Sequence, residues 1–325
     1  MNIRLSFVFV GLIGIAGLTG IAAAQTGPQA AAPNVTLDVT KLKLASASAL
    51  VLDAAADAPI YAKSADNVTP IASVTKLMTA MVVLDANQPL DEPISIGVGD
   101  LDYLKGTRSR LRLGSELTRG DMLRLALMAS ENRAASSLAR HYPGGMEACV
   151  EAMNRKARSL GMLNTHFSDP TGLSSENVST ANDLARMVKA ASEYDAIRAY
   201  TTTPSHYVEV QPYGKLLGYN NTNSLVRAGQ WDIQVSKTGF ISEAGKCLVM
   251  LANIASRPVV IVLLDSYGRL TRIGDANRVK SWLETGSGQS PKAAPRKVAT
   301  KERVSGTLAP ASTKPAPARK IKAST

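Results

Sequence analysis

Apolar runs near both ends of the folded part of the chain predict β-strands. Residues 49–53 and 59–62 are short apolar runs, and we predict that they pair as a hairpin. Residues 247–252 and 259–264 are longer apolar runs that predict two more strands. Strands are therefore expected at both ends of one folded region.

The stretch between these strands is mainly helical in pattern. Residues 77–84 form a continuous apolar run that predicts a buried helix, and 122–128 and 134–140 predict two further helices with a corner between them. A last helix is expected near residues 275–284. Periodicity alone predicts only a mixed α and β fold.

Three short strings stand in one order at wide spacing. They are Ser73-Val-Thr-Lys76, Ser130-Glu-Asn132 and Lys237-Thr238-Gly239. A serine hydroxyl is a poor nucleophile at neutral pH, so an acylating serine needs a base, a proton relay and a polar or cationic cradle. Each string alone is weak evidence, but the ordered triple is the pattern of an acylating serine site.

The first string places a lysine within reach of a serine. If Ser73 opens the helix over residues 77–84, Lys76 lies one turn along the same face and can reach Ser73 Oγ. Burial against the apolar helix favours the neutral amine, which is the form that acts as a base. The alternative is that Ser73 only caps the helix and Lys76 is solvated.

The second string has a duplicate at residues 175–177. The first copy lies at the predicted corner between two helices, whereas the duplicate follows residues 169–172 in a loop rich in Gly, Ser and Asn. Residues in such a loop are most simply turn formers. We therefore assign function to Ser130 and Asn132.

The third string follows residues 231–235, whose alternation predicts a strand at a sheet edge. Lys237 and Thr238 would then present a cation and a hydroxyl to a substrate, and Gly239 would let the substrate backbone approach closely. The alternative is a plain turn between two hairpin strands.

Residues 45–285 resemble the low-molecular-weight penicillin-binding proteins, and within them the D-alanyl-D-alanine endopeptidase branch. The resemblance is carried by residues 70–85, 130–139, 141–145 and 237–240. It implies an α+β fold like that of β-lactamases and DD-peptidases. In this fold an antiparallel sheet built from both chain ends is flanked by helices, with an inserted helical region, and the three strings meet in one cleft.

The resemblance also implies roles for single residues and no cofactor. The implied catalytic residues are the nucleophile Ser73, its base Lys76 and the proton relay Ser130. The implied substrate-binding residues are Asn132, Lys237, Thr238 and Gly239, and the backbone N–H groups of Ser73 and Phe240 form the oxyanion hole.

The resemblance favours a serine endopeptidase that opens D-alanyl–meso-diaminopimelyl cross-links in peptidoglycan and that β-lactams inhibit covalently. Phe240 replaces the histidine usual in the carboxypeptidase branch, and no strand-rich region follows Trp282. A β-lactamase would need a carboxylate that activates water to hydrolyse the acyl-enzyme. We interpret the candidate for that role, Glu176, as a surface residue instead. The alternatives are a D-alanyl-D-alanine carboxypeptidase and a non-catalytic scaffold that binds the cell wall.

The N-terminal segment predicts export to the periplasm. Arg4 precedes an apolar stretch over residues 5–21, and residues 22–24 are small, as at a signal-peptide cleavage site. An uncleaved membrane anchor is the alternative. We predict a signal peptide over 1–24, a flexible segment over 25–44 and the catalytic domain over 45–286.

The C-terminal segment, residues 287–325, predicts a basic disordered tail. It is rich in Pro, Ala, Ser and Thr and has nine Lys and Arg against Glu302, so that most of the net charge of +11 lies there. It has no aromatic residues, and the chain is expected to be exported, so nucleic acid is not an expected partner. An arm that binds an anionic cell wall or membrane surface is expected, with an inert tail as the alternative.

The remaining candidate ligands predict no further chemistry. Cys149 and Cys247 are expected to be buried free thiols, although a disulfide between them is possible in an oxidising compartment. The three histidines have no metal-ligand spacing, so a metal site has little support.

Overall fold

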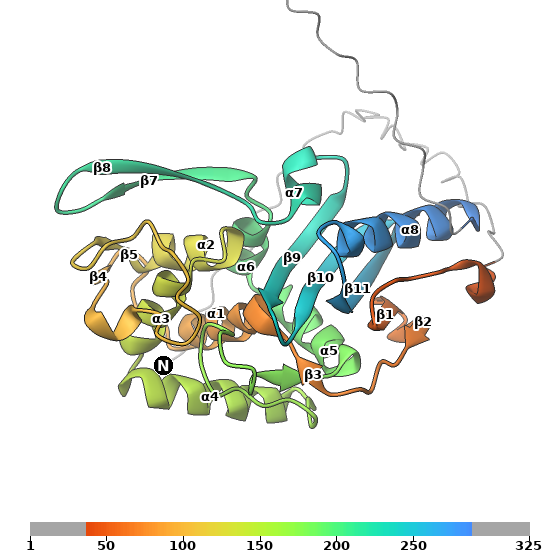
Figure 1. Cartoon of the computed structure of the whole chain (residues 1–325), viewed down its shortest axis with the longest axis horizontal. Helices are drawn as coiled ribbons and strands as arrows, with labels where there is room; N and C mark the ends of the chain where they lie inside the picture. Colours follow the sequence, from red (N-terminus) through yellow and green to blue (C-terminus); the bar gives the residue numbers. More distant parts are fainter. Residues whose placement is uncertain (1–36, 288–325) are drawn as a thin grey trace, which may run out of the picture. The chain divides into compact units, whose positions relative to one another are not determined.

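A five-stranded antiparallel sheet organises the computed structural model, which describes residues 37–287. The strand order is β2-β1-β11-β10-β9, so the two strands from the start of the region pair with three from its end (Figure 1). The strands are β1 (Ser48–Asp53), β2 (Ala58–Lys63), β9 (Asp232–Ile241), β10 (Gly245–Ile254) and β11 (Arg257–Ser266). The predicted strands and their antiparallel arrangement are confirmed.

The sheet separates two apolar cores. In β11, Val260 and Val262 belong to the core on one face, and Val259 and Ile261 belong to the core on the other. Because successive side chains of a strand point to opposite faces, a strand covered on both faces is apolar at every position. This explains the continuous apolar runs in the sequence.

The last helix, α8 (Thr271–Thr285), covers one face of the sheet. Its Trp282 is fully buried and meets the ring of Tyr61 edge-on, with ring centroids 6.4 Å apart. Leu42 and Leu44 are buried in the same core, so packed structure begins ahead of residue 45. The helix itself begins four residues earlier than the sequence predicts.

The opposite face packs against α5 (Ala181–Ala191) and the helical region that contains α1 (Lys76–Asp85). Eight of the ten residues of α1 are buried, from Lys76 to Val83, so this helix is apolar nearly all round, as expected of a core helix. The other helices are α2 (Arg119–Met128), α3 (Asn132–Arg140), α4 (Gly145–Ser159), α6 (Asp195–Thr201) and α7 (Ser224–Ala228).

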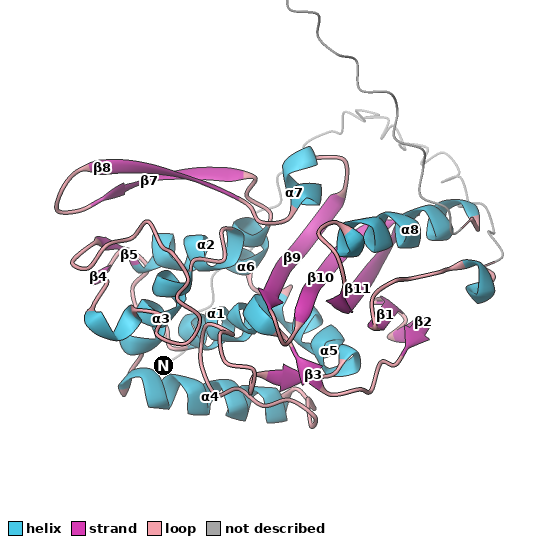
Figure 2. Cartoon of the chain, in the orientation of Figure 1, coloured by secondary structure: helices cyan, strands magenta, loops and turns pink. Residues whose placement is uncertain are grey.

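In the described part of the chain, three two-stranded ladders lie outside the main sheet, and the sequence pattern did not predict them (Figure 2). They are β3–β6 (Thr69–Pro70 with Val178–Ser179), β4–β5 (Pro93–Ser95 with Glu116–Thr118) and β7–β8 (Ser205–Val210 with Lys215–Asn220). The first ladder matters for function because it fixes the chain just ahead of the first string. Within residues 37–287, no helix combines the length and apolar character needed to cross a membrane.

Candidate active site

Ser73 lies on a tight turn between the main sheet and α1. The turn is a short 3-10 helix, η2 (Ala72–Thr75), and Ala72 has φ of +49°, a conformation that costs free energy for a residue with a side chain. Thr75 Oγ1 donates to the Ala72 carbonyl at 2.8 Å and stabilises the turn. The serine therefore stands at a sharply bent point rather than at a regular helix cap.

Two glycines allow the chain to close around this turn. A Cβ on Gly239 would lie 2.9 Å from the Ile71 carbonyl oxygen, and one on Gly172 would lie 2.0 Å from that of Ala72. Such approaches exclude any larger residue. The close approach predicted at Gly239 therefore exists, but the group that approaches is the backbone of the protein's own serine turn.

Lys76 begins α1 and its amine contacts three oxygens. Its Nζ lies 2.9 Å from Ser73 Oγ, 2.7 Å from Asn132 Oδ1 and 2.6 Å from the Thr171 carbonyl. A neutral amine can donate to two of these acceptors and still direct its lone pair at the serine hydroxyl. The contact with Ser73 that the sequence predicts is present.

Burial changes the proton affinity of this amine. Lys76 is 1% exposed, and desolvation lowers its pKa from 10.5 to about 7, against the opposing effect of Asp169, Glu131 and Asp102. A substantial fraction of the amine is therefore neutral at physiological pH. The alternative of a solvated lysine is wrong.

Ser130 lies at the corner between α2 and α3, as the sequence predicts. Its φ is +58°, and its Oγ accepts a hydrogen bond from Lys237 Nζ at 2.9 Å. Asn132, the first residue of α3, turns toward Lys76. The corner thus contacts Lys76 of the first string through Asn132, and Lys237 of the third string through Ser130.

Lys237, Thr238 and Gly239 lie on β9, one of the two edge strands of the main sheet. The alternative of a plain turn is therefore wrong. Lys237 is 1% exposed, and its pKa is lowered well below the usual value, first by burial and then by the charges of Lys76 and Arg272. The free edge of β9 leaves backbone groups available to an extended peptide.

The loop that contains Asp102, Lys105 and Thr107 reaches from the helical region to the main sheet. Asp102 accepts hydrogen bonds from the backbone N–H groups of Leu104, Lys105 and Thr107, and Thr107 Oγ1 accepts one from Asn132 Nδ2 at 2.9 Å. Lys105 pairs with Glu243 in the turn between β9 and β10, with Nζ 2.5 Å from Oε1. This contact could not be predicted from the sequence, because its partners are 138 residues apart.

The loop with the duplicate string supports the serine turn. Asn177 is fully buried, accepts from the backbone N–H of Asp169 at 3.1 Å and donates to Thr75 Oγ1 at 3.0 Å. Glu176 is exposed, as predicted. The asparagine is more than a turn former because it ties this loop to the turn that carries Ser73.

Arg272, in the first turn of α8, was not singled out from the sequence. Its guanidinium donates to the carbonyl oxygens of Gly239 at 2.6 Å and Cys247 at 3.0 Å, and so braces the end of β9. Cys247 and Cys149 are buried free thiols, as expected. In the described part of the chain, no three His, Cys, Asp or Glu side chains gather as metal ligands would.

A serine at a strained turn, a buried lysine beside it, a second serine and an edge-strand lysine define a serine acyl-transfer site of the penicillin-binding type. The family model for D-alanyl-D-alanine carboxypeptidases matches residues 34–268. The chain belongs to this family of serine peptidases, known as peptidase family S11.

Two curated relatives carry a more specific description. A D-alanyl-D-alanine endopeptidase from Pseudomonas aeruginosa is 51% identical over 75% of this chain and 79% of the relative. One from Escherichia coli is 48% identical over 80% of this chain and 84% of the relative. A D-alanyl-D-alanine carboxypeptidase from Bacillus subtilis is 30% identical over 77% of this chain and 64% of the relative.

The fold is similar to that of a solved DD-transpeptidase from Streptomyces strain K15. The TM-score is 0.68 at 28% sequence identity, over 73% of this chain and 96% of that one. The predicted family, fold class and serine DD-peptidase activity are confirmed by these comparisons.

Proposed function

We propose that the chain hydrolyses D-alanyl–meso-diaminopimelyl cross-links through an acyl-enzyme on Ser73. The observation that carries this proposal is the buried amine of Lys76, 2.9 Å from Ser73 Oγ and with a pKa of about 7. A catalytic base works best when its pKa is near the operating pH.

In the first step, Lys76 removes the hydroxyl proton as Ser73 Oγ attacks the carbonyl carbon of the D-alanyl residue. The backbone N–H groups of Ser73 and Phe240 stabilise the negative charge on the carbonyl oxygen. Ser130, held by Lys237, relays a proton to the leaving nitrogen of diaminopimelate as the amide bond breaks. Water then hydrolyses the ester and restores the serine.

Substrate binding is proposed along the free edge of β9. Asn132 donates an amide hydrogen bond to a peptide carbonyl, while Lys237 and Thr238 orient the end of the peptide beyond the scissile bond. Gly239 contributes through its position on β9, where it lets the serine turn lie against the strand. Phe240 is 57% exposed at the mouth of the site and is available for apolar contact with substrate.

The endopeptidase assignment is favoured over the carboxypeptidase assignment by the identities of 48–51% with endopeptidases against 30% or less with carboxypeptidases. The test is digestion of purified cross-linked muropeptides. Conversion of dimers to monomers supports the proposal, release of free D-alanine alone supports a carboxypeptidase, and no product with intact protein supports a scaffold. The family also makes β-lactams the expected covalent inhibitors.

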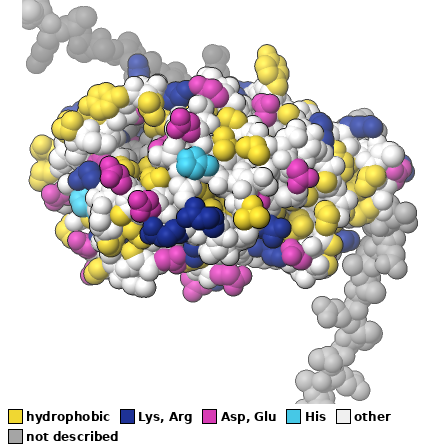
Figure 3. All heavy atoms as spheres, turned by 90° about the horizontal axis from the view of Figure 1, so that it is seen from below, with side chains coloured by type: hydrophobic (Ala, Val, Ile, Leu, Met, Phe, Trp, Pro, Cys, Tyr) yellow, Lys and Arg dark blue, Asp and Glu magenta, His cyan; other side chains and the backbone are white. Residues whose placement is uncertain are grey.

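Export and wall binding complete the proposal. The signal peptide over 1–24, most of the segment over 25–44 and the tail from 288 lie outside the described residues. We assign the enzyme to the periplasm and the basic tail to an anionic wall or membrane surface. The face of the folded body in Figure 3 has basic side chains next to acidic ones, so the tail is the stronger basic element. Loss of retention on isolated sacculi after deletion of residues 287–325 is the test.

A further inference from the structure

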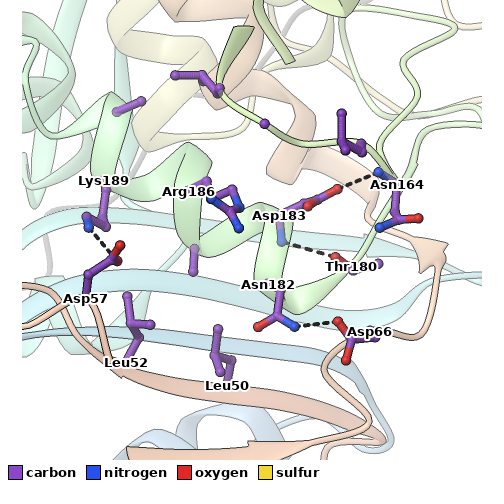
Figure 4. A pocket seen from close by; sticks show the side chains of 15 residues that line it. Leu50, Leu52, Asp57, Asp66, Asn164, Thr180, Asn182, Asp183, Arg186 and Lys189 are labelled. Atoms are coloured by element: carbon purple, nitrogen blue, oxygen red, sulfur yellow. Dashed lines mark hydrogen bonds and ion pairs between the residues drawn. The ribbon is translucent and has the colours of Figure 1, made fainter. Parts of the chain in front are cut away.

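A second hollow lies between the β1–β2 hairpin, α5 and the loop that follows α4 (Figure 4). Its volume is about 520 Å³, within the range of small-ligand sites. None of its lining residues belongs to the three catalytic strings. It is therefore a feature that the proposed peptidase chemistry does not use.

The floor of this hollow is apolar. Leu50 and Leu52 from β1 and Ala185 from α5 line it and are themselves buried. At its rim, Leu163 is 80% exposed, an unusual exposure for a leucine beside a cavity. These groups can cover an aliphatic segment of a ligand.

Most polar groups around the hollow already have partners in the protein. Lys189 Nζ lies 2.6 Å from Asp57 Oδ1, and Asp183 Oδ2 accepts from the Asn164 N–H at 2.9 Å (Figure 4). These pairs hold the walls together. These paired groups therefore offer a ligand few free hydrogen-bonding positions.

Two exposed charged groups, Arg186 and Asp66, have no ion-pair partner within the described residues. Within residues 37–287, the Arg186 guanidinium makes no hydrogen bond or ion pair, although Figure 4 shows it among the polar groups of the hollow. Asp66 accepts from Asn182 Nδ2 at 2.6 Å through Oδ1, and its other oxygen has no hydrogen bond in the described part. A guanidinium fork fits a carboxylate, and a free carboxylate oxygen fits an ammonium group.

We propose that this hollow binds the zwitterionic end of a diaminopimelate residue that is not cross-linked. The ligand carboxylate pairs with Arg186, its ammonium pairs with Asp66, and its hydrocarbon chain covers Leu52. This inference rests on the proposed function, because hydrolysis of the cross-link adds water across the amide bond and frees that amine. The hollow would then hold the enzyme on peptidoglycan that it has already opened.

The test is a titration of the mature protein, first treated with benzylpenicillin so that the catalytic cleft is blocked. The probe is the tetrapeptide L-Ala-γ-D-Glu-meso-diaminopimelyl-D-Ala, and the readout is the NMR shift of leucine methyl groups. Saturable shifts at Leu52 and Leu163 are expected. Their absence at millimolar peptide, with the protein folded, would overturn the inference.

Variants separate specific binding from general attraction. Arg186→Gln should weaken binding by about threefold, because it removes a charge-assisted pair at an exposed side chain. Asp66→Asn, or acetylation of the peptide's side-chain amine, should weaken it by about threefold, since that carboxylate is exposed. The matched control is Arg155→Gln, an exposed arginine on α4 paired with Glu151, which should bind normally. Equal binding by the Arg186 and Arg155 variants contradicts the inference.

Failure of this inference is distinguishable from failure of the proposed function. Mass spectrometry of the penicillin adduct and digestion of muropeptide dimers report on the cleft alone. If the enzyme is active but the methyl signals of Leu52 and Leu163 do not shift when peptide is added, only the second site is rejected. An inactive enzyme would reject the proposed function, and the same methyl shifts would still report whether the peptide enters the hollow.

Discussion

The helical side of the cleft and its strand side each bury one lysine, and the two lysines have different neighbours. Lys76, on the helical side, lies among oxygen acceptors and within the field of three acidic side chains. Lys237, on β9, contacts Ser130 Oγ and the Thr238 carbonyl, and the charges that act on it are cations.

This difference separates two uses of the same side chain. Acidic neighbours limit the fall in the pKa of Lys76, which stays near 7, so the residue exchanges protons at working pH. Like charges lower the pKa of Lys237 further. A substrate carboxylate beside Lys237 would favour its charged form, so binding and protonation on the strand side are coupled.

Removal of the nucleophile should have the largest effect. Ser73→Ala leaves the lysines and their surroundings in place but removes the atom that is acylated. We expect turnover to fall by about 10⁶ and labelling with a fluorescent penicillin to disappear, with the melting temperature little changed. Persistent covalent labelling would show that the acylated residue lies elsewhere.

The two lysines should respond differently to arginine. Lys76→Arg keeps the positive charge but cannot provide a neutral nitrogen, so acylation should fall by about 10²–10⁴. Lys237→Arg keeps a charged donor on the strand side, so its acylation rate should fall less than that of Lys76→Arg. Penicillin-labelling rates of both variants make the comparison, and near-normal labelling of the Lys76 variant would refute its role as base.

Substitution of Gly172, which packs against the serine turn, should cost more stability than substitution of a glycine in open space. Gly172 has φ of +77°, and its Cβ would collide with the Ala72 carbonyl, whereas Gly106 has φ of +61° and open space around it. Gly106→Ala should therefore cost only about 1–2 kcal/mol of backbone strain. Gly172→Ala should add about 1–3 kcal/mol of overpacking and slow acylation at least about tenfold. Equal unfolding free energies for the two variants would contradict the packing argument.

The pair that joins the two sides of the cleft should have the smallest effect. Lys105 and Glu243 are partly exposed, so screening limits their coupling to less than about 1 kcal/mol in a double-mutant cycle of unfolding free energies. Acylation by a small penicillin should change little in Lys105→Ala. A coupling of several kcal/mol would mean that this contact holds the cleft together.

The sequence could predict much of the site because its chemistry is local. Ser73 and Lys76 are three residues apart, and the apolar runs of β10 and β11 follow from strands covered on both faces. The strings at Ser130 and Lys237 were correctly placed at a helix corner and on a strand, because the flanking patterns there are strong.

The sequence could not predict contacts that exist only after folding. Arg272 braces β9 from a helix 33 residues further on, and Asn177 reaches Thr75 across 102 residues. Gly239 was expected to face substrate backbone, but a single chain does not reveal that its own serine turn packs there. The hairpin β7–β8 was missed because only β7 alternates; in β8 Leu216 is exposed and Gly218 has no side chain.

The most direct test of the account is the pH dependence of acylation by a penicillin, measured by stopped flow with Ser73 intact. Burial lowers the pKa of Lys76 from 10.5 to about 7, so the amine is protonated and inactive as a base below that value and neutral above it. The acylation rate should therefore rise with pH through a midpoint near 7 and then level off. A midpoint near 10, or a rate that does not change with pH, would contradict the claim that neutral Lys76 activates Ser73.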